Sequence, residues 1–215
     1  MKLTMIRLFS FAVIGVLLFS LLSCNQNEKP RSVRTSNVDT ISSYKQDMTS
    51  NPYSAIDVSP MDMSYYPDDY PQLKMVDSVN GPPLAKIVYS RPHLQGRKLF
   101  GEILKYRVPW RLGANEATDL QLYREVTIQG KKIKEGRYVL YCIPDEDKWT
   151  IVFNSNIDSW GLKPDPKKDL YKFVVPVKQT ENHLEYFTMV FEKADTGAEL
   201  VMAWDNLEAR LPINF

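Results

Sequence analysis

The sequence predicts an all-β domain, an antiparallel β-sandwich or jelly-roll-like fold of eight to nine strands, and three observations support this. Beyond Pro71, short runs of β-branched and aromatic residues alternate with Gly, Pro and Asp turns at the spacing typical of all-β domains. Several of these runs alternate polar and apolar residues, as half-buried strands do. No stretch of this region keeps a sustained helical period. Residues 71–215 are therefore expected to form one β domain.

The first predicted strands lie on both sides of a long polar connection. The run 84–90 is rich in apolar and β-branched residues. In 118–123, Leu120 and Leu122 fall on one face, and 125–129 repeats this alternation before a glycine turn. Each run is thus expected to place one face against the core.

The clearest pair of predicted strands is 136–143 and 148–154, because the turn residues 144–147 join these two β-rich runs as in a hairpin. Three more β-rich runs follow, and a last one ends the chain. These later strands are expected at 170–177, 183–192, 198–205 and 207–213.

The first residues predict an exported lipoprotein. Lys2 and Arg7 precede an apolar run that is too short for a comfortable membrane span and ends in a small residue before Cys24. Leu-Leu-Ser-Cys at 21–24 resembles the lipobox of bacterial lipoproteins, in which the Cys is acylated and becomes the mature N-terminus. The resemblance implies a signal peptide over 1–23 and a membrane partner reached through lipid on Cys24. An ordinary signal peptide followed by a chance Cys is the alternative.

Residues 24–70 are predicted to form a flexible tether, because they are rich in Ser, Asn, Asp, Thr and Pro and show no sustained period. Asn25 follows the Cys in place of the Asp that commonly retains lipoproteins at the inner membrane, which favours the outer membrane. Without residues 1–23 the chain holds 25 basic and 26 acidic residues, so its charge does not indicate a nucleic-acid partner. The oligomeric state stays open.

The Cys and His content restricts the kinds of site that the chain can hold. With Cys24 lipidated, Cys142 is a single thiol in an apolar run, which predicts a small buried residue rather than a disulfide or a metal ligand. Only His93 and His183 are present, too few for a three-histidine zinc site. No nucleophile elbow, phosphate-binding glycine loop or metalloprotease motif occurs. We expect no metal and no cofactor, and a binding protein is favoured over an enzyme.

Two long connections, 91–115 and 155–169, hold the candidate site residues. Loops of this length in a compact domain are usually functional or disordered, and their Arg, Trp and Gly content argues against disorder. Guanidinium groups bind carboxylates or phosphates, and an indole beside them offers a stacking face. The candidate ligand-binding residues are Arg91, Arg97, Trp110, Arg111, Asn115, Glu116, Asn154 and Trp160.

These residues support three hypotheses. The first is a binding module for a small polar or anionic ligand, such as a carbohydrate or peptide fragment. The second is a hydrolase with Glu116 and His93 as candidate acid and base, and with Arg97 or Arg111 stabilising negative charge. The third is a structural envelope protein in which the arginines and Glu116 pair with one another. Whether Arg97 and Arg111 face a cavity or protein carboxylates distinguishes the three.

The first connection also resembles a bacterial family of unknown function, DUF2911. The resemblance depends mainly on Trp-Arg-x-Gly-Ala-Asn-Glu-Ala-Thr at 110–118, with Tyr-Ser-Arg-Pro at 89–92 and Trp-Gly at 160–161. It covers the chain from about Pro83 to the C-terminus. It implies an exported all-β domain, often a lipoprotein, and it implies no reaction.

Overall fold

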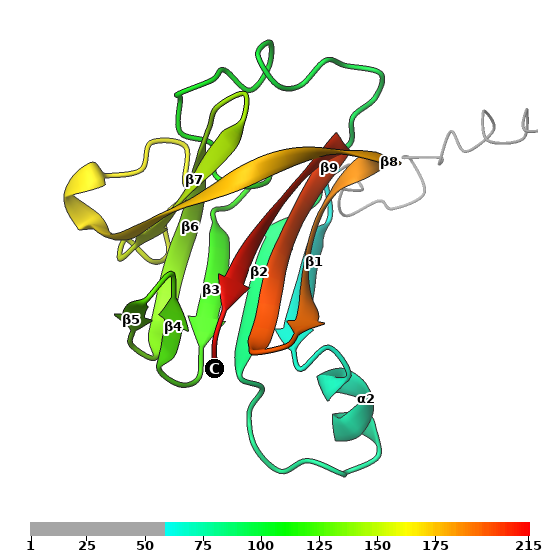
Figure 1. Ribbon diagram of the computed structural model, residues 1–215, viewed down its shortest axis with the longest axis vertical. Helices are drawn as coiled ribbons and strands as arrows, with labels where there is room; N and C mark the ends of the chain where they lie inside the picture. Colours follow the sequence, from blue (N-terminus) through cyan, green and yellow to red (C-terminus); the bar gives the residue numbers. More distant parts are fainter. Residues whose placement is uncertain (1–58) are drawn as a thin grey trace, which may run out of the picture. The chain divides into compact units, whose positions relative to one another are not determined.

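A computed structural model describes residues 59–215, and nine strands make up most of this part of the chain, which confirms the all-β prediction (Figure 1). The strands are β1 (Met61–Tyr66), β2 (Ala85–Ser90), β3 (Thr118–Leu122), β4 (Val126–Ile128), β5 (Lys131–Ile133), β6 (Gly136–Pro144), β7 (Lys148–Asn154), β8 (Asp169–Ala194) and β9 (Gly197–Ile213). Two short helices accompany them, α2 (Tyr70–Met75) and the 3-10 helix η2 (Pro166–Lys168). The predicted signal peptide, Cys24 and the tether up to residue 58 lie outside the described residues.

Seven strands form one sheet in the order β1-β2-β3-β6-β7-β8-β9, and β4 pairs with β5 separately; every pairing is antiparallel. The long strand β8 pairs with β7 through 169–176 and with β9 through 177–194. Its second part also lies beside β1, where the Phe191 amide donates to Ser64 Oγ at 3.1 Å. The sheet thus curls until its ends nearly meet, and one continuous sheet supplies both layers of the expected sandwich (Figure 1).

An aromatic cluster fills the inside of this curled sheet. The ring of Trp110 lies 5.9 Å from those of Trp149 and Trp204, centroid to centroid, and Phe187 packs against Trp110 at 5.0 Å. Trp110 comes from the first long connection, yet its backbone pairs with that of Cys142 on β6. The loop is therefore built into the core at this point. Cys142 is fully buried, as predicted, and burial raises the pKa of its thiol.

The later strands are longer than the sequence predicts. The runs expected at 170–177 and 183–192 belong to the single strand β8, and those expected at 198–205 and 207–213 belong to β9. The polar residues between the runs continue the β8–β9 pairing. Its register shifts after Gln179 and after Leu184, and such irregularities let a strand bend without ending.

Two short strands lie where none is predicted. β5 follows the turn at Gly130 and pairs with β4. β1 lies inside the range expected to be tether, and it pairs with β2 from Met61 opposite Ser90 to Tyr66 opposite Ala85. The tether prediction is therefore wrong for 61–66: pairing with a buried neighbour stabilises a sequence that is too polar to predict a strand by itself. No helix among the described residues is long and apolar enough to cross a bilayer.

Candidate functional site

The segment 110–118 is a tight turn anchored from inside the domain. The Trp110 indole N–H donates to the Gly113 carbonyl at 3.1 Å, and the Thr118 hydroxyl donates to the Leu112 carbonyl at 2.7 Å. Both hydrogen bonds are buried, and Leu112 itself is fully buried. Trp110, Leu112 and Thr118 of this motif thus hold the turn in place, because buried backbone carbonyls need such partners.

Two glycines let the turn pack closely against its neighbours. A Cβ on Gly113 would lie 2.9 Å from the carbonyl oxygen of Ser90. Gly161, with φ +78°, comes from the second long connection; a Cβ there would lie 2.9 Å from Cβ of Ala117 and 3.1 Å from Cβ of Arg111. The two connections therefore meet at this turn, as the candidate site requires.

One side of the turn opens into a cavity of about 270 Å³, which we call the arginine cavity. Its lining is mostly apolar, with two guanidinium groups and, among the described residues, no acidic side chain. The lining includes Arg97, Leu99, Trp110, Arg111, Leu162 and Trp204. The first connection supplies both arginines, and the second supplies Leu162.

Neither arginine of this cavity has a carboxylate within 4 Å in the described part of the chain. Arg111 donates one long hydrogen bond, from Nη1 to the Trp160 carbonyl at 3.4 Å. Burial lowers the pKa of Arg111, because a low-dielectric surrounding disfavours the charged form. Arg97 donates to the carbonyls of Leu94 and His93 through Nε and Nη2, which leaves its Nη1 without a hydrogen bond within residues 59–215. Both guanidinium groups thus retain donors for an anion.

The other side of the turn faces a larger cavity of about 540 Å³, which we call the sheet groove. It lies over the outer face of β2, β3 and β6, with 158–160 as a wall. Its lining includes Lys86, Glu116, Asp119, Gln121, Arg137 and Trp160. Arg137 pairs with Asp119 at 2.5 Å and with Asp158 at 2.8 Å. It therefore links the wall, through Asp158, to the strands that form the floor of the groove. The hydrogen bond to Asp119 raises the pKa of Arg137.

Arg91 lines neither cavity. It donates to the Asp62 carboxylate, the Phe187 carbonyl and the Thr188 hydroxyl at 3.1, 3.2 and 3.1 Å. Its guanidinium carbon also lies 5.6 Å from the ring centre of Tyr186. These contacts join β1 to β8, so the Arg91 guanidinium is engaged within the protein.

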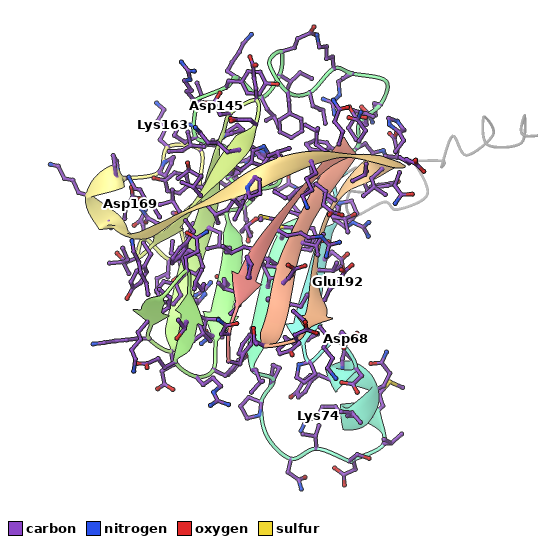
Figure 2. All side chains as sticks on the ribbon, in the orientation of Figure 1. Asp68, Lys74, Asp145, Lys163, Asp169 and Glu192 are labelled. Atoms are coloured by element: carbon purple, nitrogen blue, oxygen red, sulfur yellow. The ribbon has the colours of Figure 1, made fainter. Side chains whose placement is uncertain are left out.

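Asn154 is also used inside the protein. Its side chain is buried and bonds to the Asp165 carbonyl, the Asp169 carboxylate and the Asn156 amide. Burial by itself raises the pKa of Asp169, but hydrogen bonds from Asn154, Lys172 and Tyr141 outweigh burial and lower this pKa. Asp169 begins β8 (Figure 2), so this cluster fixes the end of the second connection.

Asn115 and His93 complete the predicted set. Asn115 has φ +54°, a conformation that Asn tolerates well, and its carboxamide donates to the Ser59 carbonyl at 3.1 Å. The His93 ring packs edge-on against Tyr186, with 3.8 Å between ring centres. His93 and Glu116, the two catalytic candidates, form no hydrogen bond or ion pair with each other in the described structure.

An arginine–glutamate network does exist, but at Arg210 on β9. Arg210 contacts Glu192, Glu199 and Glu208 at 2.6, 2.9 and 2.6 Å, and these hydrogen bonds raise its pKa, the one to Glu208 most. Glu192 lies toward the end of β8 (Figure 2). The internal pairing that the third hypothesis places at the 110–118 turn is therefore found on the β8–β9 surface.

Sequence reasoning missed the floor of the sheet groove. Alternation along β3 contained the signal, because Asp119 and Gln121 must face away from the core that holds Leu120 and Leu122. The same rule places Arg137 of β6 on this outer face. What the sequence does not show is that these strands are neighbours.

The fold and the site define an all-β domain with a cavity on each side of one loop turn. The model of the family described as "Protein of unknown function (DUF2911)" matches residues 72–213, and the chain belongs to this family. The match confirms the resemblance that the 110–118 motif carries. No curated protein and no solved structure matches the chain.

Proposed function

We propose that the protein is a lipid-anchored binding protein of the bacterial envelope, and that its β domain binds a small organic anion in the arginine cavity. The observation that carries this proposal is the state of Arg97 and Arg111. Both line one cavity, and neither has a carboxylate partner among the described residues. A cavity that keeps two cationic groups unpaired is suited to an anion from outside.

The chemistry of the cavity describes the ligand further. A partly buried guanidinium loses hydration, and a bound carboxylate or phosphate compensates by accepting two parallel hydrogen bonds. Leu99, Trp110 and Trp204 supply apolar contact for the rest of the molecule. The volume of about 270 Å³ lies near the lower end of small-molecule pockets, roughly 300 Å³. We therefore expect a compact apolar body that carries one anionic group.

The hydrolase hypothesis receives less support from this arrangement. Glu116 opens into the sheet groove, whereas Arg97 and Arg111 line the arginine cavity. An acid or base needs to reach the reacting group within hydrogen-bond distance, and Glu116 lines a different cavity from Arg97 and Arg111.

Calorimetric titration tests the anion site directly. Octanoate and phenyl phosphate serve as anionic probes, and octanamide is the neutral control. We expect at least one anion to bind, octanamide not to bind, and Arg111→Met to weaken anion binding tenfold or more, about 1.4 kcal/mol. Arg210→Met removes a saturated arginine elsewhere and should leave binding unchanged. Equal binding by the Arg111 variant, or no binding of either anion, contradicts the proposal.

The lipid anchor is tested on the full chain. The basic residues, apolar run and lipobox-like segment at 1–24 support acylation of Cys24, and two or more acyl chains hold a protein stably on a bilayer. Membrane fractionation should place the wild type with the outer membrane, and Cys24→Ser should shift it to the soluble fraction or block processing. Mass spectrometry of an unacylated mature N-terminal peptide from the wild type would exclude the anchor.

A further inference from the structure

The sheet groove has no part in the proposed anion site, and its floor is a regular array. Side chains alternate along strands, so one face of β2, β3 and β6 carries the residues that do not enter the core. Lys86, Gln121 and Arg137 are register partners across the three strands, and Val88, Asp119 and Val139 form the next row. The first row is polar throughout, and in the second row two valines flank Asp119.

The wall of the groove presents an indole. The Trp160 side chain lines the groove and the residue is 56% exposed, whereas the other three tryptophans are buried in the core. The backbone at this position is held, because the next residue, Gly161, packs directly on Ala117 and the Trp160 carbonyl accepts a hydrogen bond from Arg111. An exposed indole offers a flat apolar surface beside a polar floor.

The charged groups of the groove have mixed sign. Two basic residues, Lys86 and Arg137, and three acidic residues, Glu116, Asp119 and Asp158, line it. Lys86 and Glu116 form no ion pair within the described residues, whereas Arg137 holds both aspartates. A lining with donors and acceptors but no excess of positive charge does not favour an anion or a nucleic acid.

These features match a ligand whose polar groups both donate and accept. A hydroxyl group has one donor hydrogen and two acceptor lone pairs, so carboxylates, an ammonium and a carboxamide all serve it. A sugar ring also has an apolar face that packs on an indole. A peptide is less suitable, because peptides add to sheets at an edge, whereas the backbones of β2 and β3 are paired on both sides.

We propose that the sheet groove binds a neutral oligosaccharide, with a sugar ring packed on Trp160 and hydroxyl groups bonded to Glu116, Lys86 and the Asp119–Arg137 pair. The groove volume of about 540 Å³ lies inside the range of small-molecule clefts, roughly 300 to 1,000 Å³. The groove and the anion site have different linings, since Arg97 and Arg111 do not line the groove.

The test is calorimetric titration of the wild-type protein with maltotriose, cellotriose, mannotriose and triacetylchitotriose. We expect one of them to bind with a Kd of about 1 mM or lower. Trp160→Ala should weaken this binding tenfold or more, and Glu116→Gln should weaken it severalfold. Leu162→Ala is the matched control, because Leu162 is an exposed residue of the same loop that lines the other cavity. It should bind the saccharide as the wild type does.

Three outcomes overturn the proposal: no binding of any trisaccharide up to about 10 mM, binding that Trp160→Ala leaves unchanged, or equal loss in the Leu162 control. Titration with a hexapeptide of alternating Ser and Lys distinguishes the remaining ligand class. Peptide binding that is tighter than saccharide binding and lost in Trp160→Ala would replace the saccharide assignment. Failure of octanoate and phenyl phosphate to bind would leave this proposal intact.

Discussion

Arg210 on the β8–β9 surface and Arg111 in the 110–118 turn are both partly buried, but they differ in their partners. Strand register places Glu192 opposite Glu199, and Arg210 bonds to both and to Glu208. Arg111 has an apolar surrounding and, within residues 59–215, only a long hydrogen bond to a carbonyl. On the strands, charge pairing holds the structure. At the 110–118 turn, close backbone contacts hold the structure, and the Arg111 charge stays available to a ligand.

Gly161→Ala should give the largest loss of stability, because it breaks the close contact between the second connection and the 110–118 turn. Alanine at φ +78° is strained, and its Cβ would meet Ala117 and Arg111. Strain and overpacking together should lower the free energy of unfolding by about 3 kcal/mol. Urea denaturation measures this loss.

Gly130→Ala separates the two causes. Gly130 has φ +76°, and no described atom lies within 4 Å of the position of its Cβ. This control should lose only the part of the unfolding free energy that comes from backbone strain, about 1 kcal/mol. Equal losses of stability in both variants would show that close contact with the 110–118 turn does not hold the second connection in place.

Arg210→Ala should give the second largest effect. It leaves Glu192 and Glu199 directly opposite each other on neighbouring strands, and like charges in that position repel. We expect the free energy of unfolding to fall by about 2 kcal/mol. Adding Glu199→Gln to this variant should restore part of the loss, because it removes the repulsion. A double variant no more stable than Arg210→Ala would contradict this explanation.

Asp169→Asn should have a smaller effect that depends on pH. The folded-state pKa of Asp169 is lowered, so its contribution is present above the ordinary pKa of 3.8 and is lost as pH falls through the folded-state value. At pH 7 the variant should be about 1.5 kcal/mol less stable than the wild type, and the two should converge below pH 3.8. The exposed Asp68→Asn serves as the control. A difference that stays constant with pH would show that the carboxylate charge is not the cause.

Most of the fold could be predicted from the sequence, because periodicity and turn residues identify β2, β3, β4, β6 and β7. It does not show that β8 and β9 are single strands, since their polar middle parts are stabilised by pairing with each other. It also does not predict β1, whose residues become a strand only beside β2. Long-range pairing, which no local pattern reports, decides these cases.

Less of the candidate site than of the fold could be predicted from the sequence. The 110–118 motif identifies the turn, but its adjacent residues Trp110 and Arg111 differ in burial: both line the arginine cavity, and only Trp110 belongs to the core. Composition alone does not separate them. The floor of the sheet groove combines Lys86, Asp119 and Arg137 from β2, β3 and β6, and β4 and β5 lie between β3 and β6 in the chain. Only the strand order brings these side chains together.

Arg111→Met should give the smallest effect on stability, and this is the sharpest test of the comparison. Burial without a carboxylate partner disfavours the charged group, so a shorter, unbranched apolar side chain should leave the free energy of unfolding within about 0.5 kcal/mol of the wild type or raise it. Arg210→Met, measured in the same urea series, should lose about 2 kcal/mol because three carboxylates lose their partner. Equal losses in the two variants would mean that Arg111 supports the fold as Arg210 does. A stable Arg111→Met that no longer binds octanoate or phenyl phosphate would instead assign this guanidinium to the ligand, because a group kept for packing alone would cost stability when removed.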